Sequence, residues 1–149
     1  MTHALIHTQG VVLGKKYVTL ELAYQDVMGI RAHFHIRSPL NYSAMRKFYP
    51  NARPDVVVIT EGGTSYAEVI HFLKLRFRRL SNELGPYVIF GYKGESYQPQ
   101  VLRDAGIPHI MNVEKFGVPA LKVTDKACYL HKRNESKCAL VALDQILRL

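Results

Sequence analysis

Apolar and polar residues alternate along the first third of the chain in a pattern that predicts three consecutive strands. Residues 4–13 are apolar and β-branched, and residues 16–27 and 30–37 alternate. In the middle segment one face carries Val18, Leu20, Leu22 and Tyr24, and the other carries Thr19, Glu21 and Ala23. Short connections around Gly14 and Gly29 favour an antiparallel meander.

The rest of the chain predicts strands and helices in alternation. Apolar residues recur every three or four positions from Tyr66 to Leu84, so a helix is expected there, with Thr64 or Ser65 as N-cap and Gly85 at its end. The other expected elements are a short helix over 41–49, strands over 56–59, 87–92 and 107–113, a helix over 96–105 and a last helix over 138–149. This order predicts one α/β domain over 1–149, in which an antiparallel meander leads into parallel strands flanked by helices.

The composition adds a strong positive charge to this picture. The chain has 20 Lys and Arg against 12 Asp and Glu, a net charge of +8, and 48% of its residues are hydrophobic. This composition excludes a disordered chain, and the charge favours a polyanionic partner. No apolar run has membrane-spanning length, and the first residues do not resemble a signal peptide. We therefore expect no membrane contact and an intracellular location, cytoplasmic or nuclear, where the two cysteines are thiols or metal ligands.

Both cysteines lie near the end of the chain, in the pattern Cys128-x2-His131-x6-Cys138. Thiolates and imidazoles are the ligands that a structural zinc ion prefers, and such a site needs four ligands in a tetrahedron. The spacing alone leaves two interpretations open. One is a zinc site, and the other is two core thiols and a surface histidine that do not meet.

Basic residues gather in two places. Lys74, Arg76, Arg78 and Arg79 belong to the outer face of the strongest predicted helix, and Lys132 and Arg133 stand between the candidate metal ligands. A basic run on a helix is usually a solvated face over an apolar stripe. Together with the net charge, it also fits a surface that binds RNA phosphates. Histidines that stand alone are usually structural, so no catalytic residue is assigned.

The order of elements is that of the RNase H-like fold, and local signatures resemble its DEDDh exonuclease branch. Active members carry Asp-x-Glu in the first strand, Phe-Asp at a helix start and His-x4-Asp on the final helix. The corresponding acidic positions here hold His7, Gln9, Gln98 and Leu143. Two-metal hydrolysis needs several converging carboxylates, so the resemblance implies a domain without magnesium-dependent exonuclease activity.

The candidate zinc ligands extend the resemblance to the Maelstrom domain, an RNase H-like domain with a Glu-Cys-His-Cys zinc site. Carried over residue by residue, the zinc ligands are Glu21, Cys128, His131 and Cys138. Residues 32–36 and 38–40 also resemble the third strand and following loop of that domain. The resemblance implies structural zinc, single-stranded RNA as ligand and a role in small-RNA (piRNA) or transposon silencing within a ribonucleoprotein. It also implies that metal-independent cleavage of single-stranded RNA is an available activity.

Two other functions are compatible with the same residues. The first is a protein-interaction scaffold, in which the basic surface contacts an acidic partner. The second is an active RNA nuclease that uses Glu21, Glu61 or Asp144 in a rearranged metal site. Salt-dependent RNA binding distinguishes the first function from an RNA-binding domain, and activity that requires a divalent cation supports the second.

Overall fold

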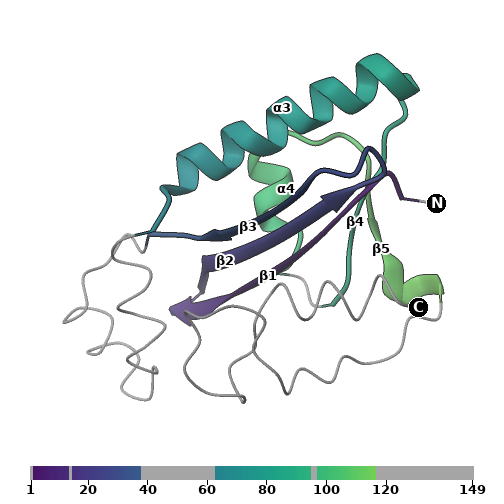
Figure 1. The fold of residues 1–149 in the computed structure, drawn as a ribbon. Coiled ribbons are helices and arrows are strands. Elements are labelled where there is room, and N and C mark those ends of the chain that lie inside the picture. Colours follow the sequence, from purple (N-terminus) through teal and green to yellow (C-terminus); the bar gives the residue numbers. More distant parts are fainter. Residues whose placement is uncertain (1, 14, 38–62, 95–96, 117–149) are drawn as a thin grey trace.

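A computed structural model describes residues 2–13, 15–37, 63–94 and 97–116. Its elements are β1 (Ala4–Leu13), β2 (Lys16–Asp26), β3 (Arg31–His35), α3 (Tyr66–Leu84), β4 (Phe90–Tyr92), α4 (Gln100–Asp104), β5 (Ile110–Asn112) and a 3-10 turn (Val113–Phe116). The strands form one sheet in the order β3-β2-β1-β4-β5, antiparallel through β1, β2 and β3 and parallel from β1 to β5 (Figure 1). The predicted α/β architecture with a mixed sheet is therefore confirmed. The elements expected over 41–49, 56–59 and 138–149 lie outside the described residues.

The long helix α3 begins and ends where its sequence predicts. The Ser65 side chain accepts a hydrogen bond from the Glu68 backbone N–H, which satisfies one of the amides left unpaired at the helix start. At the other end, Gly85 has a φ of 95°, a conformation that other residues rarely adopt, and its N–H donates to the Ser81 carbonyl.

Three predicted elements are shorter than expected. The strand expected over 87–92 is hydrogen-bonded as a strand only over Phe90–Tyr92, and Tyr87 is 76% exposed. The Ile89 N–H donates to the His3 side chain at 3.0 Å, and the Ile89 carbonyl accepts from the backbone N–H groups of His3 and Ala4, so this residue is bonded to the beginning of β1 outside the regular ladder. Likewise, α4 covers only Gln100–Asp104 of the helix expected over 96–105, and β5 covers only Ile110–Asn112 of the strand expected over 107–113.

Both helices cover the same face of the sheet (Figure 1). The core between the helices and the sheet contains Ile6, Leu22, Tyr24, Leu73, Leu80, Phe90, Val101 and Leu102. The opposite face carries two rows of paired residues, His7–Ala23–His33 and Gln9–Glu21–His35. The side chains of His7 and Glu21 are nevertheless buried, so β2 is not a strand with one solvent-exposed face.

A β-bulge changes the direction of the side chains near the start of β2. Gln9 pairs with Glu21 but Gly10 pairs with Thr19, which leaves Leu20 without an opposite residue. Beyond the bulge, Thr19 lines a pocket next to Tyr66 of α3. The expectation that Thr19 shares a face with Glu21 is therefore wrong, because strict alternation holds only where no extra residue interrupts the ladder.

The described part of the chain contains no helix that is long and apolar enough to cross a membrane.

Candidate functional site

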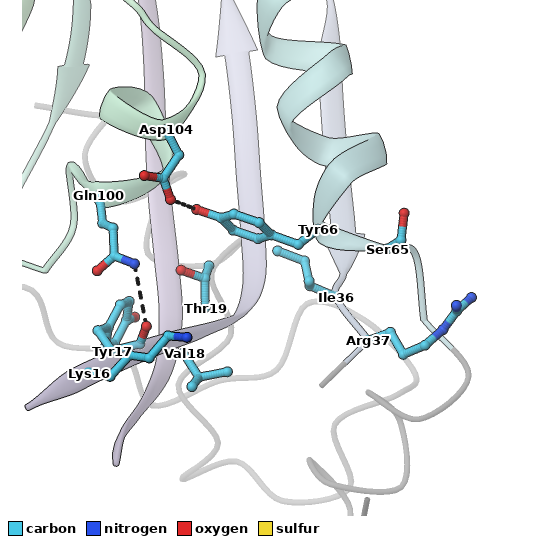
Figure 2. A pocket seen from close by; sticks show the side chains of 10 residues that line it. All are labelled: Lys16, Tyr17, Val18, Thr19, Ile36, Arg37, Ser65, Tyr66, Gln100 and Asp104. Carbon is cyan, nitrogen blue, oxygen red and sulfur yellow. Dashed lines mark hydrogen bonds between the residues drawn. The ribbon is translucent and has the colours of Figure 1, made fainter. Parts of the chain in front are cut away.

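A pocket of about 450 Å³ lies where the start of β2, the end of β3, α3 and α4 meet (Figure 2). It is lined by Lys16, Tyr17, Val18, Thr19, Ile36, Arg37, Ser65, Tyr66, Gln100 and Asp104. The bulge in β2 contributes to this lining because it turns Thr19 toward the helices. The volume falls within the range of about 300–1,000 Å³ that is typical of small-molecule sites.

The polar groups of the pocket are held by hydrogen bonds between its walls. The Tyr66 hydroxyl of α3 donates to Asp104 Oδ2 of α4 at 2.5 Å (Figure 2). Burial, together with this bond, raises the pKa of Tyr66 above its ordinary value, so the phenol stays protonated. Gln100 Nε2 donates to the Tyr17 carbonyl at 3.5 Å, and Lys16 and Arg37 are exposed. Among the described residues of the lining the one carboxylate, Asp104, accepts the Tyr66 hydroxyl, and the other polar side chains can donate or accept hydrogen bonds to a bound molecule.

The positions that correspond to the first exonuclease acids lie together on the sheet face opposite the helices. His7 Nε2 and Gln9 Nε2 are 3.0 Å apart, and His7 Nδ1 is buried with no partner among the described residues. Burial lowers the pKa of His7 from 6.5 to about 4, with the Glu21 charge opposing this shift and the Lys93 charge adding to it. The imidazole is therefore neutral near pH 7 and supplies no negative charge at this position.

Gln98, at the third position that the resemblance aligns with an exonuclease acid, holds the segment before α4 against β1. Its Oε1 accepts from the Thr8 backbone N–H at 2.9 Å and from the Thr8 hydroxyl at 3.0 Å. Its Nε2 donates to the Thr8 carbonyl at 2.8 Å. An aspartate has no donor for that carbonyl, so the amide has a structural role here. The fourth position, Leu143, lies outside the described residues.

Glu21, the proposed zinc ligand on β2, is buried beside a histidine. Its Oε1 lies 2.8 Å from His33 Nε2, and the His33 ring lies 4.7 Å from the ring of His35. Within the described ranges no group of three or more potential ligands is arranged to hold a metal ion. Cys128, His131 and Cys138 lie outside those ranges, so the four-ligand zinc site stays a prediction.

The basic run on α3 divides into one inward and three outward side chains. The expectation that Arg76 lies on the outer face is wrong, because its Nη2 is 2.9 Å from Asp26 Oδ2 and its side chain is 13% exposed. Lys74, Arg78 and Arg79 are exposed and form no ion pair with any other described residue. Lys132 and Arg133 lie outside the described residues, so their predicted RNA contacts remain predictions.

Comparison with known proteins gives this chain no family. No protein-family model matches the sequence, and no curated protein is similar enough to count as a match. The function must therefore be inferred from the residues and their geometry.

Sequence reasoning missed the pocket as a unit. No sequence pattern singles out Lys16 or Arg37, and the alternation along β2 places Thr19 on the wrong face. The pairing of Tyr66 with Asp104 joins residues 38 positions apart, and no local pattern predicts such a contact. A weak signal existed in Gln100, a polar residue next to the apolar pair Val101 and Leu102.

Proposed function

We propose that this chain is an RNA-binding domain on a catalytically degenerate RNase H-like fold, and that a structural zinc ion stabilises it. The observation that carries the proposal is the outer surface of α3, where Lys74, Arg78 and Arg79 are exposed and unpaired among the described residues. Exposed cations that are not held in ion pairs attract the phosphates of a nucleic acid, and the net charge of +8 acts in the same direction.

The sheet supports the RNase H-like part of the proposal. An antiparallel meander followed by two parallel strands, with helices packed on it, is the arrangement that this resemblance implies. His7, Gln9 and Gln98 carry no negative charge, and Glu21 is already bonded to His33. We therefore expect no magnesium-dependent trimming of RNA or DNA from the 3′ end. A 3′-labelled and a 5′-labelled oligonucleotide, incubated with magnesium or manganese, test this; shortening that stops with chelator would support the nuclease alternative.

Fluorescence anisotropy with a labelled single-stranded RNA of about 12 nucleotides, a length within the usual site sizes, tests RNA binding. The affinity should fall steeply between about 50 and 200 mM salt, with a log–log slope of about −0.7 for each phosphate contact. In the double variant Arg78→Glu/Arg79→Glu the affinity should fall for all sequences alike, because phosphate contacts do not read bases. Its salt dependence should also become less steep, by about 1.4, if both arginines contact phosphates.

Two control variants separate a local surface from a general charge effect. Arg78→Lys/Arg79→Lys keeps both charges and should bind nearly as well as the parent. Arg31→Glu/Arg103→Glu makes the same change in net charge at exposed positions on β3 and α4, and should weaken binding less than the α3 variant. Equal weakening by both charge reversals would show that α3 is not the RNA surface. A parent protein that binds no RNA at low salt would refute the proposal and favour the protein-interaction scaffold.

A further inference from the structure

The pocket between β2, α3 and α4 has walls that suit a flat aromatic ring. Apolar side chains come from Val18 and Ile36, and the Tyr66 ring spans the gap between α3 and α4 (Figure 2). Tyr17 completes the lining and is held in place by stacking on Tyr97, with ring centroids 5.2 Å apart. Because these walls are fixed by contacts within the protein, a ligand would meet a largely preformed site.

Two basic residues belong to the lining of the pocket. Lys16 and Arg37 are exposed and stand on either side of Val18 and Ile36 in the view of Figure 2. The acidic member of the lining, Asp104, accepts the Tyr66 hydroxyl. The lining therefore carries two cations against one hydrogen-bonded carboxylate. This balance favours an apolar ligand that is attached to an anion.

Two polar side chains can contact the edge of such a ring. Gln100 projects into the pocket, and only its Nε2 is engaged, in a long bond of 3.5 Å to the Tyr17 carbonyl (Figure 2). Thr19 lies beside it with a hydroxyl that can donate or accept. Carboxamides and hydroxyls are the groups with which proteins hydrogen-bond the edges of unpaired bases.

We infer that this pocket binds a single unpaired base of the RNA, with Lys16 and Arg37 on the phosphates to either side. The inference rests on the proposed function and adds a base-binding subsite to its phosphate-binding surface. The pocket lies on the helix side of the sheet, whereas His7 and Gln9 lie on the opposite face. It therefore lies on the other side of the sheet from these two positions. A base linked to two phosphates matches the two cations of the lining better than the side chain of a neutral peptide does.

The test compares RNA with bases and RNA without them. The probes are a labelled uridine oligonucleotide of about 12 nucleotides and the same backbone made of abasic ribose units. The parent should bind the uridine probe about tenfold more tightly, because stacking and hydrogen bonding of one base contribute about that factor. Filling the pocket with Gln100→Trp should remove this difference by weakening binding to the uridine probe alone. His109→Trp, which adds the same ring at an exposed position outside the pocket, should bind both probes as the parent does.

A second variant, Thr19→Val, removes the hydroxyl and keeps the shape of the side chain. It should weaken binding to the uridine probe severalfold and leave binding to the abasic probe unchanged. Equal affinity of the parent for both probes would overturn the base pocket and leave phosphate binding by α3 intact. If the parent protein binds neither probe, the proposed function is overturned together with the inference. In an NMR titration, uridine monophosphate should shift the backbone amides of residues 16–19. Shifts with N-acetylphenylalanine amide and none with the nucleotide would assign the pocket to a peptide and also overturn the inference.

Discussion

Arg76 is the residue whose substitution most directly tests the packing of α3 on the sheet. It contacts Asp26, whose side chain is fully buried at 0% exposure. Arg76 Nε donates to Asp26 Oδ2 at 3.0 Å, and Arg76 Nη2 lies 2.9 Å from the same oxygen. Asp26 also accepts hydrogen bonds from the Tyr24 hydroxyl at 2.5 Å, the Met28 N–H at 3.0 Å and the Ile30 N–H at 3.1 Å. Arg76 therefore provides the only positive charge among the described contacts of this carboxylate.

Arg76→Gln removes that charge and leaves the buried Asp26 side chain without its cationic partner. Removing one partner of a buried ion pair costs about 3–5 kcal/mol. The lower end applies here, because the Tyr24 hydroxyl and two backbone N–H groups still donate to Asp26. We therefore expect a loss of about 3 kcal/mol in the free energy of unfolding. With a urea dependence of about 2 kcal/mol/M, the midpoint of unfolding should fall by about 1.5 M.

Urea denaturation followed by circular dichroism measures this change. Arg79→Gln is the matched control, since Arg79 is exposed on the same helix, and its stability should stay within about 0.5 kcal/mol of the parent. Asp26→Asn/Arg76→Gln should be more stable than Arg76→Gln alone, because the unpaired charge is gone. RNA affinity of the folded protein should depend on Arg79 and not on Arg76. A loss below about 1 kcal/mol for Arg76→Gln would show that the ion pair does not hold α3 to the sheet.

Three further predictions concern the sheet and the metal. Because burial lowers the pKa of His7 from 6.5 to about 4, the unfolded chain takes up a proton before the folded protein does as the pH falls. The free energy of unfolding of the parent should therefore decrease by up to about 3 kcal/mol between pH 7 and pH 4. Urea titrations at both pH values should show a smaller decrease for His7→Gln. Gln98→Ala leaves the buried Thr8 N–H and carbonyl without this partner and should cost about 2–3 kcal/mol; unchanged hydrogen exchange at the Thr8 amide would contradict this. Elemental analysis should find one zinc per chain, and Cys128→Ser or Cys138→Ser should lower both metal content and melting temperature; if both variants melt and bind metal like the parent, there is no such zinc site.

The sequence by itself determined the features that depend on neighbouring residues. The limits of α3 follow from its apolar period, from Ser65 at its start and from Gly85 at its end. The meander of β1, β2 and β3 follows from alternation and from short turns. The inward position of Arg76 was also readable, because Arg76 lies three residues after the buried Leu73 and four before the buried Leu80. The outer-face prediction for Arg76 was wrong because a charged side chain is expected in solvent, whereas here it pairs with the buried Asp26.

The tertiary structure decided the features that depend on pairing between distant residues. The extra residue Leu20 in β2 becomes a bulge only when β1 is aligned beside it, and that alignment turns Thr19 toward α3 and α4. Gln98 meets Thr8 across 90 positions of the chain, and Arg76 meets Asp26 across 50. A sequence pattern gives the direction of a side chain relative to its own strand or helix. The partner it meets depends on how the elements pack, because register and packing are determined by the whole core at once.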